Sequence, residues 1–303
     1  MLRYSADRRA VAYLVAVATL GVVQWNLGPT HRVLDVAVPL LGSVDLALYV
    51  PYLLLCVATA VISHNHNHLS MWRWKPANVL TNYVITVHYG HPAIAWVPTH
   101  NQNHHKLNNR EGDTGRSPGL FRGNHLLSLL TYPLYTGLRQ QADIKRFLAE
   151  LRHRDRKAWA LAVSEYVVYA AFLLVVFALD WRKALLLYVV PPQLALFTIQ
   201  VFNYVQHVEA DAQSEWNHSR NFVSPLLNAW LFNNGYHTVH HLRPGVHWSQ
   251  TPALHAQHAA KIHPALLQRS WWCYMVWTFC LRPLVPGARA PVLHDVAAAR
   301  VRG

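Results

Sequence analysis

Charged residues and cysteines are scarce in this chain, and both scarcities narrow the class of protein. Asp, Glu, Lys and Arg make up 14% of the 303 residues, whereas 52% are hydrophobic. An ordinary soluble domain has about 25% charged residues, so the apolar surface here exceeds what one globular core buries. The three cysteines, Cys56, Cys273 and Cys280, lack the paired spacing of a disulfide framework or a zinc ribbon. The composition favours a membrane protein whose metal ligands, if any, are not thiolates.

Acidic residues are especially few, 14 against 27 Lys and Arg, which gives a formal net charge of +13. Such an excess can indicate a nucleic-acid partner, but the basic residues are scattered among Trp-rich and Leu-rich stretches without a recognition motif. We therefore expect a lipid bilayer as the partner, and no nucleic acid.

Long apolar runs occur in four stretches, which we interpret as transmembrane helices: 10–26, 46–63, 158–179 and 184–205. About 20 helical residues cross a hydrocarbon core of ~30 Å, so the first two stretches are short and the last two ample. The first does not resemble a signal peptide, because Gln24-Trp25-Asn26 is no small-residue cleavage site. The segments 81–97 and 270–286 are apolar but irregular, and we expect interfacial helices there.

The distribution of positive charge predicts the topology. All but three of the 27 Lys and Arg residues lie in the N-terminus, in 64–157 or in 206–303; the exceptions are Arg32, Arg182 and Lys183. By the positive-inside rule, both termini and these two long segments are cytoplasmic. The expected architecture is an all-α integral membrane protein, one domain over 1–303, with a cytoplasmic helical cap and a loose C-terminal tail.

Histidine supplies the candidate ligands, in three clusters that follow the cytoplasmic ends of spans. On an α-helix, positions i, i+3 and i+4 share a face, so each cluster can direct two or three imidazoles at one centre. The clusters are His64-Asn-His-Asn-His68, His100-Asn-Gln-Asn-His104-His105 and His237-Thr-Val-His240-His241. His66 lies about 200° round the helix from its neighbours, so we leave it out of the ligand set.

A fourth element, Asn203-Tyr-Val-Gln-His207, closes the last span. Asn203 lies one turn before His207 and can bind metal directly or through a water. A single zinc takes four ligands, whereas nine imidazoles suit two metals with four or five each. The predicted ligands, besides Asn203, are His64, His68, His100, His104, His105, His207, His237, His240 and His241.

The pattern HxxxH, HxxxHH and HxxHH, interleaved with paired spans over roughly 50–265, resembles the membrane fatty-acid desaturase and hydroxylase superfamily. The likeness is strongest over 233–249, Asn-Asn-Gly-Tyr-His-Thr-Val-His-His-Leu-Arg-Pro-Gly-Val-His-Trp-Ser, which is similar to the third desaturase box. The Asn203/His207 pair resembles residues that acyl-CoA desaturases add to their site. The second box departs from animal acyl-CoA desaturases by one residue, which leaves the substrate open.

The resemblance implies a di-iron centre that takes two electrons, activates O2 and oxidises a C–H bond of a fatty-acyl or lipid-like chain. Nothing in the chain resembles a fused haem, flavin or iron–sulfur module, so we expect a separate ferredoxin-like or rubredoxin-like donor. Basic residues of the cytoplasmic face would attract such an acidic protein. They include Arg152, Arg154, Arg156 and Lys157. The Ala-rich and Arg-rich composition suggests a bacterial inner membrane.

Desaturation to an alkene is the favoured reaction, and the scaffold leaves alternatives open. Hydroxylation, or oxidative decarboxylation of a fatty acid to a terminal alkene, would use the same centre. A histidine-rich metal transporter is a remote alternative, because transport pathways need polar groups within the spans. Chain length, carrier and position of oxidation are not encoded in any motif.

The remaining polar residues are expected to be structural. We interpret His31, His125, His153, His218 and His294 as surface or packing residues, and His247, His255, His258 and His263 as interface residues. The loop that contains Arg110, Glu111 and Asp113 is predicted to be a solvated turn. The alternative is that its carboxylates brace the imidazoles of the second cluster. For Glu165, within the third stretch, a structural hydrogen bond, a head-group contact and a snorkelling side chain all stay open.

Overall fold

The computed structural model describes residues 1–27, 35–38 and 42–288. His31, Arg32, His294 and the expected tail lie outside these residues. The chain is mostly helical and forms two compact units. Unit 1 consists of Met1–Trp96 and Lys145–Ile199, and unit 2 consists of Val97–Ile144 and the chain from Gln200 onward. Helices α5 (Leu126–Arg154) and α7 (Val190–His207) contribute residues to both.

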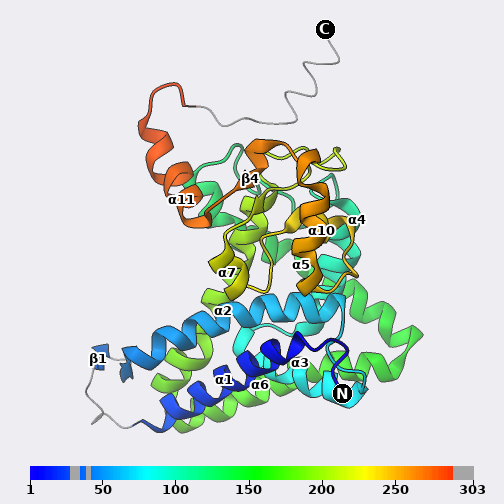
Figure 1. The fold of residues 1–303 in the computed structure, drawn as a ribbon. Coiled ribbons are helices and arrows are strands. Elements are labelled where there is room, and N and C mark those ends of the chain that lie inside the picture. The colour runs from blue at the N-terminus through cyan, green and yellow to red at the C-terminus, as the bar shows by residue number, and fades with distance from the viewer. Residues whose placement is uncertain (28–34, 39–41, 289–303) are drawn as a thin grey trace. The chain divides into compact units, whose positions relative to one another are not determined.

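Unit 1 is a helical assembly in which α1 packs on α2 and α3, and α3 packs on α6 (Figure 1). Its core residues include Val17 of α1 and Tyr52 and Ile62 of α2, all buried. A two-stranded antiparallel hairpin, absent from the all-α expectation, precedes α2. The further elements of unit 1 are α1 (Asp7–Asn26), β1 (Asp35–Val38), β2 (Gly42–Asp45), α2 (Leu46–His68), α3 (Lys75–Tyr89), η1 (Ala93–Ala95), α6 (Arg156–Ala184) and η3 (Leu185–Val189).

The apolar segment Arg156–His207 is 52 residues long and bends back on itself. A straight helix of that length would measure about 78 Å, far more than a bilayer core. Asp180 breaks it with a non-helical φ of −158° and caps the next turn by accepting from the amides of Arg182 and Lys183. The rings of Phe172 and Tyr188 lie 4.7 Å apart, although a straight helix would separate them by about 24 Å. The two predicted stretches 158–179 and 184–205 are therefore successive arms of a hairpin.

Two segments of the described residues are long and apolar enough to cross a membrane: Leu46–His68 and Arg156–His207. The first extends five residues beyond the predicted stretch 46–63, so that His64 and His68 lie on the last turns of α2. The predicted stretch 10–26 forms α1, which does not pass the same test. Residues 81–97 form the end of α3 and shorter helical turns, and 270–286 form three short helical segments.

Glu165 of α6 fixes the chain between α3 and η1. Its carboxylate oxygens accept from Asn82 Nδ2 and from the Ile94 amide, both at 2.8 Å. The residue is only 4% exposed, so these bonds replace the water that the carboxylate would otherwise need. Of the three roles left open by the sequence, the structural hydrogen bond is the one observed.

Unit 2 contains shorter helices and a small parallel strand pair, β3 with β4. Its core includes Tyr132 of α5, Tyr204 of α7 and Phe232, each buried. Its further elements are η2 (Val97–His104), α4 (His105–Leu107), β3 (Asn221–Phe222), α8 (Pro225–Trp230), α9 (His237–Leu242), η4 (Trp248–Gln250), α10 (Thr251–His258), η5 (Ala259–Lys261), η6 (Pro264–Leu266), β4 (Leu267–Gln268), α11 (Trp271–Val276), η7 (Trp277–Leu281) and η8 (Arg282–Leu284).

Replacing Glu165 by Ala should destabilise the protein, because the buried donors of Asn82 and Ile94 lose their acceptor. The expected cost is about 1–3 kcal/mol per unsatisfied buried donor, and Glu165→Gln, which keeps one acceptor oxygen, should cost less. Thermal unfolding of the detergent-solubilised protein measures the effect, with the exposed Glu150→Ala as the control. Equal midpoints for Glu165→Ala and the wild type would contradict the role.

Candidate metal centre

Four imidazoles from three elements of unit 2 converge in a buried cluster, which we call the four-histidine group. His104 ends η2, His207 ends α7, and His237 and His241 lie one turn apart on α9. Their Nε2 atoms form a series of close contacts: 3.1 Å from His104 to His207, 2.9 Å from His207 to His237, and 3.1 Å from His237 to His241. Four ring nitrogens directed at one point are a ligand set for a metal ion.

Backbone and carboxylate partners determine which ring nitrogens carry a proton. His104 Nδ1 lies 2.7 Å from Asp113 Oδ2, and His207 Nδ1 lies 3.2 Å from the backbone oxygen of His218. Because both partners are acceptors, each Nδ1 carries the hydrogen and each Nε2 keeps a lone pair. The two Nε2 lone pairs thus face each other, an arrangement that a cation between them stabilises. The Nε2 atoms are therefore suited to bind a metal ion, and the hydrogen bonds at the Nδ1 atoms hold the two rings in orientation.

The pKa shifts of His241 and Asp113 favour the protonation states that metal binding needs. Burial, followed by the neighbouring imidazoles of His105, His237, His207 and His104, lowers the pKa of His241 well below its usual value. Burial tends to raise the pKa of Asp113, but His104 and the amides of Asn109 and Gly115 outweigh it and lower the pKa to about 2. Neutral imidazoles beside an ionised carboxylate are what metal binding requires.

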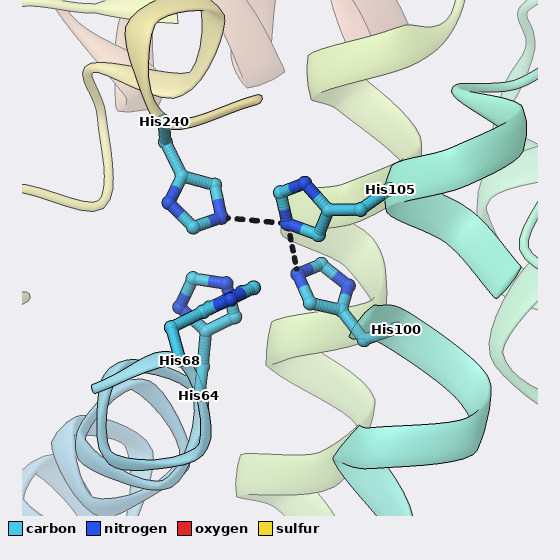
Figure 2. A group of neighbouring side chains, drawn as sticks. All are labelled: His64, His68, His100, His105 and His240. Carbon is cyan, nitrogen blue, oxygen red and sulfur yellow. Dashed lines mark hydrogen bonds between the residues drawn. The ribbon is translucent and has the colours of Figure 1, made fainter. Parts of the chain in front are cut away.

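A second cluster of unit 2, the three-histidine group, contains His100, His105 and His240. Figure 2 shows His105 between the other two, and the dashed lines join its Nε2 to those of His100 and His240, each at 3.0 Å. This group adjoins the first: the rings of His105 and His241 stack with centroids 4.3 Å apart. Unit 2 therefore holds two neighbouring sets of imidazoles.

The clusters do not divide as α-helical spacing predicts. The spacing places His100 with His104, but η2 is a π-helix, whose i→i+5 bonds bring His100 and His105 to one side and turn His104 to the other. The adjacent residues His240 and His241 of α9 also point to different groups. His240 belongs to the three-histidine group and His241 to the four-histidine group. Each of these two sequence clusters supplies both groups rather than one.

The first sequence cluster belongs to unit 1. His64 and His68 project from the same face of α2 (Figure 2), with ring centroids 4.8 Å apart and the His64 ring 5.2 Å from that of Trp96. His66 points elsewhere: its Nδ1 accepts from the Met71 amide and so closes the end of α2. His66 therefore lies on a different face of α2 from His64 and His68, as the helical spacing predicts.

Asn203 lies one turn before His207 on α7, beside the four-histidine group. Its Nδ2 donates to the Tyr132 hydroxyl and, at 3.4 Å, to the Gly115 backbone oxygen. These bonds use the nitrogen end of the amide, so the oxygen end is the one available to a ligand. The same Gly115 donates its amide to Asp113 Oδ1, which joins Asn203 and the His104 brace in one loop.

The turn before α9 is closely packed and determines where His237 lies. The Gly235 amide donates to Asn228 Oδ1 at 3.0 Å, and its carbonyl accepts from the Phe222 amide at 2.9 Å. A Cβ at Gly235 would overlap the Phe222 carbonyl oxygen and lie 2.7 Å from Asn228 Oδ1. Only glycine fits between strand β3 and the start of α9.

Two contributors to this centre were not assigned by the sequence. For Asp113 the sequence favours a solvated turn, and this prediction is wrong for the side chain, which is fully buried; the alternative, a brace for the second cluster, is what the structure shows. His218, for which the sequence predicts a surface or packing role, is 3% exposed, and its ring lies 5.4 Å from that of His241. Loop residues of this kind have no periodic relation to the clusters, so spacing gives no signal for them.

Other histidines have structural partners, as expected. His247 Nδ1 contacts the Ser249 hydroxyl, and His263 Nδ1 accepts from the Ala265 amide. The rings of His255 and His258 lie against Tyr236 and Trp216.

Residues 41–274 match the family model described as fatty acid desaturase, which covers most of the chain. The chain belongs to this family. No curated protein and no solved structure is significantly similar to it. Together with the two apolar segments and the histidine groups, the membership identifies a membrane protein of the oxidoreductase type that acts on fatty acids and has residues suited to hold metal.

Replacing Asp113 by Asn should weaken metal binding at the four-histidine group. An amide cannot accept from His104 Nδ1, the Asn109 amide and the Gly115 amide together, so one donor would face an NH2 group. Losing such a brace costs about 10–100-fold in metal affinity. Competition with a chelator measures the change, and Glu111→Gln, exposed in the same loop, is the control. Unchanged affinity in Asp113→Asn would refute the brace.

Gly235→Ala should displace α9 and lower both the unfolding temperature and the metal content. Gly245→Ala is the matched control, because an added Cβ there meets nothing within 4 Å. Thermal unfolding and metal analysis of the two variants test the difference. If both variants behave like the wild type, Gly235 does not constrain His237.

Proposed function

We propose that this protein is a di-iron enzyme that uses O2 to oxidise an unactivated C–H bond of a fatty-acyl or lipid-like substrate, most simply by desaturation to an alkene. One observation carries the proposal: a chain of the fatty acid desaturase family has two adjoining imidazole groups. Within each group, neighbouring Nε2 atoms lie about 3 Å apart. Imidazole is a good ligand for iron, and the shortage of thiolates argues against iron–sulfur ligation.

In this proposal the four-histidine group holds one iron, and the three-histidine group holds the other with His64 and His68 as further ligands. Four and five imidazoles are the numbers expected for two metals. Asn203 completes the set, directly or through a water. When bound, the two irons supply the capacity to accept electrons and activate O2.

The protein's own contribution is orientation and exclusion of water. Asp113 and the His218 carbonyl hold the protons on the Nδ1 atoms, so that the Nε2 atoms stay free to bind. Burial of His104, His207 and His237, each below 5% exposure, limits access of water, which suits oxidation of an unreactive chain. Electrons would come from a separate ferredoxin-like or rubredoxin-like protein, drawn to the excess of Lys and Arg.

The proposed setting is a bacterial inner membrane, with both units forming one membrane-embedded enzyme. The four helical stretches, α1, α2 and the two arms of the 156–207 hairpin, would be its spans, leaving the metal centre and both termini in the cytoplasm. The hairpin supports this topology, because reversal at Asp180 returns the chain to the side from which it entered. Arg182 and Lys183 are the only basic residues at this reversal, and so small a number agrees with the positive-inside rule.

Co-expression with a reductase system and labelled acyl substrates should give products lighter by two hydrogens. His237→Ala should abolish this turnover and lower the iron content, as should each of the other eight ligand variants, whereas the exposed His153→Ala should do neither. Mass spectrometry of the products and iron analysis measure both effects. Gain of an oxygen would indicate hydroxylation, and loss of carbon dioxide would indicate decarboxylation. An unchanged lipid profile with iron fully loaded would refute the oxidase, and zinc with metal-dependent transport would favour a transporter.

A further inference from the structure

Helix α5 has a row of exposed leucines along its first half, which we call the leucine stripe: Leu127, Leu130, Leu134 and Leu138. Their exposed fractions are 51%, 51%, 69% and 67%. Spacings of three and four residues place them on one face over about 16 Å. The opposite face is the packed one, with Tyr132 and Thr136 fully buried. The stripe is thus an apolar surface of unit 2 that its own core does not use.

The same face of α5 changes character after Leu138. Continuing by turns of the helix, it presents Gln141, Lys145 and Arg152, all exposed. A helix facing water along its whole length would have polar residues throughout this face. The switch therefore marks a boundary, with an apolar environment along the first half of α5 and water along the second.

Cationic residues border the stripe. The preceding loop exposes Leu120 and Phe121, at 59% and 36%, between the exposed Arg116 and Arg122. Arg139 follows the last leucine and is also exposed. Apolar side chains flanked by arginines are typical of helices that lie in the surface of an anionic bilayer, where the chains enter the acyl boundary and the guanidinium groups meet phosphates.

The C-terminal helical segments of unit 2 have exposed apolar residues of their own. The Arg282 guanidinium donates to the Asn124 backbone oxygen at 2.9 Å, which joins η8 to the start of α5. The exposed residues of α11 and η7 include Trp272, Trp277 and Leu281, at 63%, 49% and 46%. Tryptophan is enriched at membrane–water interfaces, so these residues, like the leucine stripe, are suited to contact a bilayer surface.

We propose that the leucine stripe of α5 lies in the interfacial layer of an anionic lipid bilayer. A bilayer is the occupant favoured over a protein partner for two reasons. The borders of the stripe are uniformly cationic, and Asp155 alone separates α5 from α6, the start of the apolar segment Arg156–His207. The inference concerns membrane contact only and does not depend on the metal centre.

Site-specific fluorescence in the full-length protein tests the proposal. Cys273→Ser and Cys280→Ser remove the two exposed thiols, while Cys56 is buried. An environment-sensitive probe is then attached at Leu134→Cys, or at Ala142→Cys as the matched exposed control on the same helix. The protein is placed in nanodiscs of phosphatidylcholine and phosphatidylglycerol. The probe at 134 should emit at shorter wavelength, lose intensity with brominated lipid and resist iodide, and the probe at 142 should do the reverse.

Two outcomes would overturn the proposal. Equal quenching by iodide at both positions would place the stripe in water, and shielding of position 134 from both quenchers would indicate a protein partner or a second copy. Labelling of the wild-type chain by a lipid-borne diazirine avoids any folding defect of the variants. Adducts on peptides covering 126–138 would support bilayer contact, and their absence there would contradict it.

Discussion

The structure of the centre depends on one constraint: imidazole rings must be held so that their Nε2 lone pairs meet. A flexible histidine would turn its ring away from another lone pair, so each ring needs a partner behind it. For His104 this partner is the carboxylate of Asp113, and for His207 it is the carbonyl of His218. Both partners come from loops. Gly115 donates to Asp113 within the first of these loops, and Gly235 closes the separate turn that places His237.

The helices satisfy the same constraint by departing from regular geometry. A π-helical η2 pairs His100 with His105 and turns His104 to the other group, whereas an α-helix would pair His100 with His104. In α9 the division uses the rotation of about 100° between adjacent helical residues, and the rings of His240 and His241 are nearly perpendicular, at 85°. Two adjoining imidazole groups are thereby built from few elements, which is the arrangement that a two-metal oxidation of an acyl chain requires in the proposed function.

Much of this could be predicted from the sequence. The four apolar stretches correspond to α1, α2, α6 and α7, whereas the 29-residue α5 was not predicted. The spacing of 64, 66 and 68 places His66 on a different face from its neighbours, because α2 is regular. The hairpin follows from Asp180, a polar residue between two apolar runs. The division of the second cluster was not predictable, since spacing alone assumes an α-helix where the chain forms a π-helix. Asp113 and His218 lie in loops, and the periodicity of the sequence does not predict the conformation of a loop.

The central claim is that the histidine groups bind two irons through imidazole. X-ray absorption at the iron edge, on the wild-type protein purified with its native metal, tests it most directly. The account predicts a first shell dominated by nitrogen, the multiple-scattering pattern of imidazole and two irons per chain. A shell dominated by sulfur or carboxylate oxygen, a single iron, or zinc in place of iron would contradict it.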